Sequence, residues 1–487
     1  MQPLPTRPAA PNPSESRRQD HAAKRKRLLQ GNWQRDLEEE LSLHLESARR
    51  AVWGVADMSS NIWKISIDAL AKLYNENPTI EHVEDISILT ARGGLFDRAE
   101  LWPMMVTAQK LTLACNECLV RVDIAADGKN LDYRIVTPDN IYAIQPSGYN
   151  QPVFVMEYRV RNGPDKNPIW TVDLFDIRNS EEPKYQVFEV QSNGELGADL
   201  TEIYLGGTKS GAEYPFKNRQ DKPYIPFSVY HSEIHGNLWQ PFKNASILAG
   251  SLTSAAMMTM YLHMVKDCSW PQRYVAGLTL PMNAYDTETT ARRNAIATDP
   301  ASILCFTVDP AMEGMGQSMI GSFQAGGDVE KLLSSIVVYE RRLAIAMGIK
   351  AEDVQRLSGD PRSGYSISVS QESTRQNQRK QAVSMRYGDL DLIQKSAMMS
   401  NRYLGTNLPE EGYGIEYKAV GLGADELKAQ REDIIAKIDA GLIDPIDAIL
   451  SLHPSWDVPT AVSYLERIEE GRRRFPFLGT PANQKPL

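Results

Sequence analysis

Residues 329–404 constrain what this chain can fold into more than any other stretch, because they predict two helices of unequal length around a break. The first helix is expected at 329–347, where apolar side chains recur at the helical spacing. Asp328 is a suitable N-cap, and Gly348 stands where the helix should end. The break at 349–365 is rich in glycine, proline and serine, so it cannot continue a helix.

The second helix is expected at 366–404, which contains no proline and a single glycine. A helix of that length would extend for about 58 Å. Its early part, 370–381, has no apolar residue on any side. A helix that is polar all round does not pack on the core of its own domain. We therefore expect this part to bridge domains, to face a water-filled space or to be only marginally stable.

The composition is that of a globular protein of about two to four domains. Of 487 residues, 42% are hydrophobic and 24% are charged. A net charge of −9 argues against a surface covered in phosphate-binding groups. Four cysteines make no disulfide scaffold and indicate a reducing compartment. The charge-free stretch 247–265 is too polar for a typical membrane span, so no membrane contact is expected. The N-terminus is rich in proline and lacks the apolar segment of a secretory signal, so no such signal is expected.

The N-terminal half predicts a basic arm followed by an α+β domain. Residues 1–30 combine prolines with clustered lysine and arginine, which favours a solvated, partly disordered arm that becomes helical near Leu28. The alternative is a basic arm that contacts nucleic acid or a partner subunit. Helical patterns follow at 33–72 and 98–113. Alternating segments separated by turns then predict antiparallel strands at 118–124, 132–138, 153–160, 169–177 and 184–190.

The C-terminal half predicts mostly helices. The stretch 241–265 is nearly uncharged and rich in small residues, which suits a tightly packed bundle or an oligomer interface. Residues 267–327 are expected to be irregular and rich in loops, with short strands at 273–280 and 302–308 and a glycine-rich run at 313–327. After the long helix and one strand-like segment, three helices are expected at 425–440, 445–452 and 459–473, the last two with aspartate N-caps.

Cysteine and histidine provide no convincing metal or redox site. Cys115 and Cys118 form a CxxC pair, but a zinc site needs four ligands and the other two cysteines lie far along the chain. The pair closes a helix before a strand, whereas a redox pair should open a helix after one, so we expect two buried small hydrophobes. His231 and His235 lie in an extended segment, where they would not converge.

Phosphate-binding and nuclease patterns are also weak. The run at 206–211, which includes Lys209, lacks the order of a P-loop and is followed by no helix. Asp176, Glu182 and Lys184 loosely suggest a metal nuclease, but a proline between the last two should spoil the strand that would present them. No catalytic residue, metal or cofactor is therefore expected. A nuclease or nucleotide-hydrolysing enzyme in the α+β domain stays as the alternative.

Positive charge gathers in the long helical region. Between residues 341 and 402 there are eleven basic and six acidic residues, a local +5. This pattern fits a solvated helix face with ion pairs between subunits, and it fits non-specific contact with the phosphates of a polyanion equally well. No aromatic residues interleave the polar part, so a duplex sensed through its backbone fits better than stacked single strands. The basic residues are Arg341, Arg342, Lys350, Arg356, Arg362, Arg375, Arg379, Lys380, Arg386, Lys395 and Arg402.

The order of these elements resembles that of tailed-bacteriophage portal proteins from about residue 30 onward. KPYIPFSVYHSE at 222–233 is similar to the segment that leads portals into their first stem helix. GDPRSGYSISVSQES at 359–373 is similar to the junction through which many portals enter the helix that lines the channel.

The resemblance implies a ring-forming portal fold of the α+β class. It divides the chain into an N-terminal arm (1–30), an α+β wing (31–238), a first stem helix (239–266), a small clip (267–327), a second stem helix (328–348), a tunnel loop (349–365), a long channel helix with its return to the wing (366–418), a helical crown (419–475) and a C-terminal tail (476–487).

The resemblance also implies a function without catalysis. The chain would form a homo-oligomeric ring, a dodecamer, at one capsid vertex of the virion, after assembly in the host cytoplasm. Double-stranded DNA would be packaged and ejected through it. Its other partners would be the terminase large subunit, the head–tail adaptor and the major capsid protein. A different virion structural or adaptor protein is a further alternative.

The resemblance assigns candidate contact residues. In the clip, Arg292 and Arg293 are candidates for docking the terminase and the connector. The candidates for DNA contact, in the tunnel loop and the channel helix, are Lys350, Arg356, Arg362, Arg375, Arg379 and Lys380.

Overall fold

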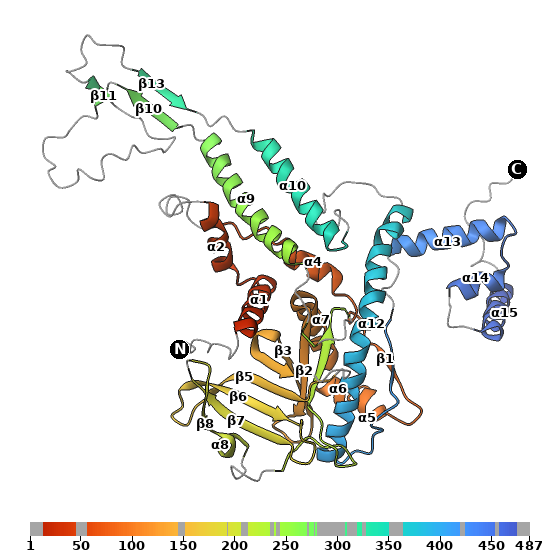
Figure 1. The fold of residues 1–487 in the computed structure, drawn as a ribbon. Helices are drawn as coiled ribbons and strands as arrows, with labels where there is room; N and C mark the ends of the chain where they lie inside the picture. Colours follow the sequence, from red (N-terminus) through yellow and green to blue (C-terminus); the bar gives the residue numbers. More distant parts are fainter. Residues whose placement is uncertain are drawn as a thin grey trace, which may run out of the picture. The chain divides into compact units, whose positions relative to one another are not determined.

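The computed structural model shows a mixed helix-and-sheet protein, as the sequence predicts (Figure 1). The chain divides into two compact units, one of Met1–Leu357 and Ser373–Ala419, the other of Ser358–Glu372 and Val420–Leu487. The structure describes residues 13–44, 56–144, 151–191, 193–205, 213–233, 238–239, 244–269, 272–276, 278–279, 307–308, 319–323, 328–349, 364–418, 424–452 and 457–474.

The N-terminal segment is a packed helix, α1 (Pro13–Gln30). The prediction of a solvated arm that turns helical near Leu28 is therefore wrong for these residues. Its positive charges do not make it a solvated arm, because several of them are bound within the protein. Arg25 is only 1% exposed. Arg27 donates two hydrogen bonds to Asp36, of 2.9 and 2.7 Å.

The helices expected before the sheet are confirmed. The segment 33–72 contains α2 (Gln34–His44) and α4 (Ile62–Leu70), and the second pattern corresponds to α7 (Leu101–Cys115). Two single-turn helices, α5 (Ser87–Thr90) and α6 (Leu95–Arg98), precede α7.

Two antiparallel sheets follow, and the predicted hairpins are confirmed. A five-stranded meander runs in chain order through β4 (Ile141–Ile144), β5 (Phe154–Asn162), β6 (Pro168–Asp176), β7 (Lys184–Val190) and β8 (Leu196–Asp199). A three-stranded sheet has the order β3-β2-β9, with β2 (Glu117–Ile124), β3 (Leu131–Val136) and β9 (Phe227–His231). The sequence did not predict β9, which pairs with β2 from about a hundred residues away. The 3-10 helix η1 (Pro138–Asn140) precedes β4, and α8 (Thr201–Leu205) follows β8.

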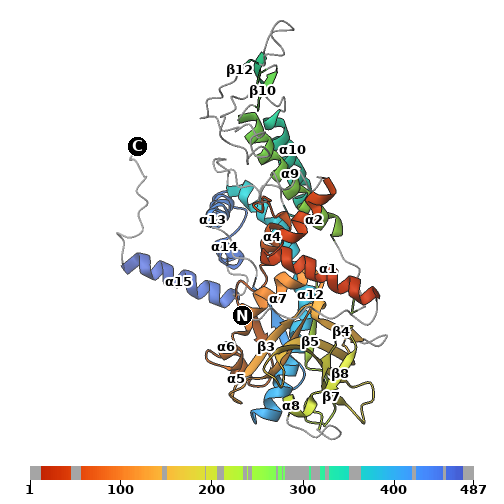
Figure 2. The same cartoon turned by 90° about the vertical axis from the view of Figure 1, so that its left-hand side faces the viewer.

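A long helical hairpin comes next, made of α9 (Ala245–Ser269) and α10 (Val329–Ala346). The two helices lie side by side in both views (Figures 1 and 2) and run antiparallel, because Ser254 contacts Glu340 whereas the earlier Gly250 packs on the later Leu343. A Cβ atom on Gly250 would lie 2.6 Å from Leu343 Cδ2, so the small residue permits this close approach, as the composition suggested.

The ends of α10 follow the prediction. The Asp328 side chain accepts a hydrogen bond from the Lys331 amide at 3.0 Å, and Gly348 adopts φ +80° after the last turn. Among the helices that the structure describes, one is long and apolar enough to cross a membrane by length and composition, at Ala245–Val265, and half of that window is buried.

Short strands lie between α9 and α10. β10 (Gln272–Ala276) pairs with β13 (Met319–Phe323), and β11 (Leu278–Thr279) pairs with β12 (Thr307–Val308), all antiparallel. The short strands expected at 273–280 are thus found as β10 and β11, and β12 lies at the end of the one expected at 302–308. β13 lies in a glycine-rich run in which no strand was predicted.

The long helix is confirmed as α12 (Gly364–Tyr403), which has 40 residues. After it, β14 (Gly414–Glu416) pairs with β1 (Thr79–Glu81), so the chain returns to the N-terminal part of the first unit. One hydrophobic core joins α7, α12 and the two larger sheets, and a second joins α1, α2, α4 and α9.

The second unit contains α13 (Ala424–Asp439), α14 (Pro445–Leu452) and α15 (Val458–Arg474), as predicted. Both expected caps form, because Asp444 accepts from the Asp447 amide at 2.7 Å and Asp457 accepts from the Thr460 amide at 3.1 Å. The assignment of these parts to wing, stem, clip, channel helix and crown stays a prediction.

Candidate nucleic-acid interface

The second half of α12 is anchored in the first hydrophobic core. Its buried side chains there include Met385, Leu392 and Ile393, each at most 2% exposed. Gly388 allows β9 to approach, since a Cβ atom at that position would lie 2.5 Å from Cδ1 of Tyr230. This part of the helix is therefore fixed against the sheet by shape as well as by apolar burial.

Three tyrosines surround one buried carboxylate of α12, Asp389. The hydroxyl of Tyr74 donates to it at 2.7 Å and that of Tyr230 at 3.0 Å, and Tyr417 donates a third hydrogen bond. Burial raises the pKa of Asp389 to about 6, although the three hydrogen bonds act to lower it. Because the tyrosines lie after α4, on β9 and after β14, this cluster ties α12 to three separate segments.

The polar part of α12 is also held within the molecule. Gln381 is 7% exposed and accepts a hydrogen bond from Gln109 of α7 at 2.6 Å. Gln378, equally buried, donates to the carbonyl of Lys418 at 3.2 Å. The prediction that 370–381 has no side facing the protein is therefore wrong for its second half. The amide groups can be buried there because they are hydrogen-bonded.

The opposite side of this segment is exposed and basic. Arg379, Lys380 and Arg386 are exposed there together with Val383 and Tyr387, each of which is 60% exposed. Steps of three and four residues place all five on one face of the helix. We call this face the α12 basic stripe. Among the described residues none makes an ion pair with its three cations, so the stripe can contact the phosphates of a polyanion.

Only some of the residues predicted to contact DNA lie on the α12 basic stripe. Arg379 and Lys380 lie on the α12 basic stripe, whereas Arg375 is half-buried beside it and has an interaction of its own. Arg386 was counted among the basic residues but was not chosen as a contact, although its spacing of seven from Arg379 would have placed it on the same face. Lys350, Arg356 and Arg362, like Arg292 and Arg293, lie outside the described residues.

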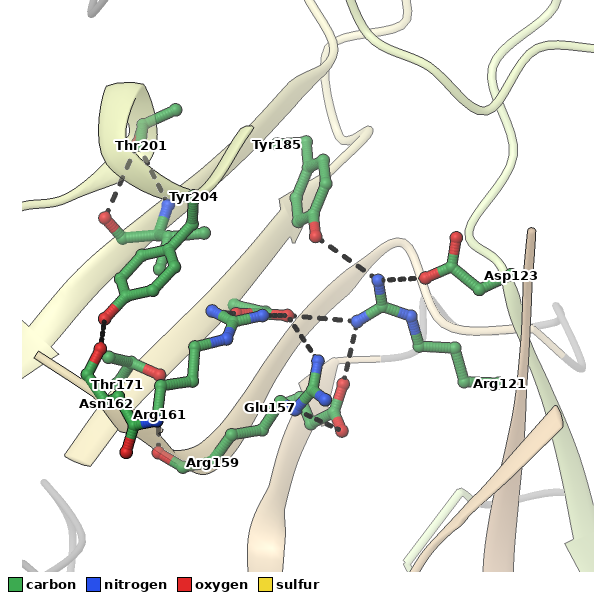
Figure 3. Close-up of polar contacts among 12 residues, drawn as sticks. Arg121, Asp123, Glu157, Arg159, Arg161, Asn162, Thr171, Tyr185, Thr201 and Tyr204 are labelled. Atoms are coloured by element: carbon green, nitrogen blue, oxygen red, sulfur yellow. Dashed lines mark hydrogen bonds and ion pairs between the residues drawn. The ribbon is translucent and has the colours of Figure 1, made fainter. Parts of the chain in front are cut away.

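A second charged cluster joins the two larger sheets around Arg121 of β2 (Figure 3). Its guanidinium, 3% exposed, donates to Glu157 on β5 and to Asp173 on β6, both at 3.0 Å. It also bonds to Asp123 at 2.6 Å and to the Tyr185 hydroxyl at 3.2 Å.

The charged groups of the Arg121 cluster stabilise one another's ionised forms. Burial alone would lower the pKa of Arg121, but Tyr185 and the three carboxylates raise it well above its usual value. Burial would likewise raise the pKa of Asp173, and the neighbouring guanidinium groups of Arg121, Arg161 and Arg159 lower it instead. With its charges paired in this way, the cluster fastens sheet to sheet and presents no reactive group.

The candidate nuclease residues do not assemble a site. Asp176 ends β6 directly opposite Lys184, the first residue of β7, so the strand begins after the proline instead of being spoiled by it. However, Asp176 is occupied by Arg178, which donates to it at 2.9 and 2.6 Å and so lowers the pKa of this carboxyl. Lys209 lies outside the described residues. Within the ranges that the structure describes, no three His, Cys, Asp or Glu side chains are grouped to hold a metal.

The other candidates are structural. Cys115 and Cys118 are free and buried, as predicted. Burial raises the pKa of the Cys115 thiol and raises that of Cys118 to about 12, so both are poor nucleophiles. His231 ends β9 in extended chain, whereas His235 lies outside the described residues. An open pocket of about 500 Å³ between α1 and α2 is lined by residues of both charges, among which Arg27 pairs with Asp36 and Arg35 pairs with Glu39.

Comparison with known proteins gives structural similarity only. No protein-family model matches the chain, and no curated protein matches its sequence. The neck of a native gene transfer agent particle, computed with C12 symmetry, is 12% identical with a TM-score of 0.40. The neck of an empty particle, computed with C6 symmetry, is 11% identical with a TM-score of 0.40. The virion of the native particle is 12% identical with a TM-score of 0.35.

Each of these matches covers 80% of this chain and 89% of the other. At such low identity and TM-score the likeness by itself assigns neither a family nor a function to this chain.

Proposed function

We propose that this chain is the subunit of a portal ring, a non-catalytic conduit for double-stranded DNA. The observation that carries the proposal is the succession of parts along the chain. An α+β body leads into an antiparallel helical hairpin, α9 and α10, with short paired strands between its two helices. A 40-residue helix, α12, then returns to the body and presents an exposed basic stripe.

The charge of the molecule suits a conduit. A net charge of −9 with a few exposed cations on one helix provides weak contact with DNA phosphates. Strong phosphate binding would instead hold the DNA in place and stall its passage. We assign the weak contacts to Arg379, Lys380 and Arg386, together with Lys350, Arg356 and Arg362 of the preceding break.

The proposal includes the setting of the ring. Twelve copies would occupy one capsid vertex of the virion after assembly in the host cytoplasm, and would contact the major capsid protein. The segment between α9 and α10, with Arg292 and Arg293, would dock the terminase large subunit and later the head–tail adaptor. Energy for packaging would come from the terminase, so the chain itself needs no cofactor.

Ring formation is tested by negative-stain microscopy of the purified protein together with its mass in solution. We expect rings with an axial hole and a mass near twelve subunits. A protein that stays strictly monomeric at micromolar concentration under assembly conditions would contradict the proposal.

The role of the α12 basic stripe is tested by replacing its three cations with glutamine, as Arg379→Gln, Lys380→Gln and Arg386→Gln together. These exposed positions should leave folding and ring formation unchanged. Binding to duplex DNA should weaken, and the slope of log Kd against log salt should fall by about 0.9 for each phosphate that the variant no longer binds. The matched control neutralises three exposed cations elsewhere, Arg92, Lys129 and Lys166. Equal salt slopes in the two variants would exclude the stripe as the surface that binds DNA.

A further inference from the structure

The outer face of α10 combines exposed apolar groups with exposed cations. Val338 is 47% exposed and Ile345 is 62% exposed. Arg341 and Arg342 lie between them at helical spacing, so the four side chains share one face. Ile336 and Leu343, on the other side, are buried. We call the four exposed residues the α10 outer face.

The two arginines of the α10 outer face have no partner within the described part of the chain. Neither makes an ion pair or a side-chain hydrogen bond there. Val338 and Ile345 likewise keep about half or more of their surface in contact with solvent. A helix face that leaves both apolar area and cations unpaired is suited to a partner that supplies apolar area and carboxylates.

The outer face of α2 supplies this complement. Glu38, Glu39 and Leu43 are exposed, Leu43 at 76%, whereas Leu37 and Leu41 on the other side are buried. We call the three exposed residues the α2 outer face. Glu39 pairs with Arg35 of the same helix at 3.1 Å, but the two side chains are 57% and 85% exposed. Such a pair is weak in water, so Glu39 can exchange its partner at little cost.

The two faces belong to opposite sides of one packed assembly. α2 and α10 both pack on α9, through Glu40 with Thr253 and through Glu340 with Ser254. Figure 1 shows α2 and α10 on the two sides of α9. The α10 outer face lies away from the contact of α10 with α9. On α2, Glu38 and Glu39 point away from the Glu40 contact, whereas Leu43 lies one turn after Glu40 at the edge of that contact and is still 76% exposed. One molecule can therefore bind a neighbour with its α10 outer face while it offers its α2 outer face to another.

We infer that the α10 outer face binds the α2 outer face of the next copy of this chain. Contact between two different patches is heterologous, and repeated with a closing rotation it produces a ring. Val338 and Ile345 then pack against Leu43, and Arg341 and Arg342 face Glu38 and Glu39. The inference rests on the proposed ring and names the surfaces that close it.

Two charge-reversed proteins test this contact. The first carries Arg341→Glu and Arg342→Glu, and the second carries Glu38→Arg and Glu39→Arg. In each protein alone, the α10 and α2 outer faces carry charge of the same sign and repel each other. We therefore expect the ring yield to fall about tenfold or more. In an equimolar mixture, the negative α10 face of the first protein meets the positive α2 face of the second. The positive α10 face of the second protein likewise meets the negative α2 face of the first. Mixing should therefore restore rings in which the two proteins alternate in a 1:1 ratio.

The controls separate this inference from the proposed function. Arg92→Glu with Lys129→Glu, two exposed reversals elsewhere, should leave ring yield unchanged. A wild-type protein that forms no rings overturns the portal proposal. Wild-type rings with unimpaired single variants, or variants that fail alone and also fail when mixed, overturn the assignment of these faces. If reversal lowers the unfolding temperature, the milder Arg341→Gln and Arg342→Gln variant takes its place and should still reduce ring yield.

Discussion

Asp389 is the residue that ties α12 to the rest of the first unit. Its carboxylate is 2% exposed and accepts hydrogen bonds from Tyr74, Tyr230 and Tyr417. The sequence showed only an aspartate in a helix, because its three partners come from segments distant along the chain. The cluster provides a polar anchor where Gly388 provides the close packing, so both residues fix the helix that carries the basic stripe.

The elevated pKa of Asp389 makes stability depend on pH in a defined direction. The folded state holds this proton more tightly than the unfolded chain, with a pKa of about 6 against 3.8. Ionisation at neutral pH therefore costs stability, by roughly 3 kcal/mol, and the cost disappears as the pH falls from above 6 to below 4.

Asp389→Asn removes this titration. Relative to the variant, the wild-type protein should gain free energy of unfolding as the pH is lowered from 7 to 4. The measurement is urea unfolding of both proteins across this range. If the free energies of unfolding of the two proteins changed in parallel with pH, Asp389 would not have the raised pKa given above.

Gly388→Ala tests the close approach of β9. The added methyl group would meet the ring of Tyr230 at 2.5 Å, and relief requires the ring or the helix to move. We expect a decrease of roughly 1–3 kcal/mol in the free energy of unfolding. Val383→Ala on the exposed side of the same helix should change it by about 0.5 kcal/mol or less. Equal effects of the two substitutions would contradict the packing described.

At the scale of elements, helices and hairpins were predictable, whereas the pairing of distant segments was not. Alternation and turns predicted β5, β6 and β7, and caps predicted α10 and α14. β9 and β1 were missed, and β14 was expected as a strand-like segment but without its partner, because the pairing segments are far apart in sequence. The charges of α1 suggested a solvated arm, and their internal partners became visible only in three dimensions.

The candidate nucleic-acid interface on α12 could be predicted only in part. The sequence identified the basic residues of the long helix. Because residues 370–381 are polar on all sides, no apolar stripe indicated which side of the helix packs against the protein. Gln381 can be buried because its side-chain oxygen accepts a hydrogen bond from Gln109. No periodic pattern in the sequence predicts such a pair. The exposed stripe becomes clear once the buried side is known, and it then includes Arg386.

The Arg121 cluster should stabilise the contact between the two larger sheets. Arg121→Met leaves Glu157 and Asp173 buried with fewer partners, and we expect the free energy of unfolding to fall by roughly 3–5 kcal/mol. Arg178→Met removes an exposed pair with Asp176 and should cost about 1 kcal/mol or less. Chemical unfolding of the two variants compares these effects. A small effect of Arg121→Met would show that Arg134, Arg159 and Arg161 suffice to balance the carboxylates.

At the scale of the whole molecule, the proposed ring has contacts that no single chain displays. In the proposed ring, the exposed faces of α2 and α10 would bind neighbouring copies, and the α12 basic stripe would contact DNA. The small residues of α9 let its helical hairpin pack closely, as Gly250 against Leu343 shows. We therefore propose two binding surfaces, one for neighbouring copies and one for a polyanion, beside the close internal packing of α9.

The most direct test is a cryo-electron microscopy reconstruction of the purified, assembled protein. We predict a closed ring of about twelve subunits in which Arg379, Lys380 and Arg386 of every copy face the axial channel. A ring with these side chains on its outer surface, or the absence of any ring under assembly conditions, would contradict it.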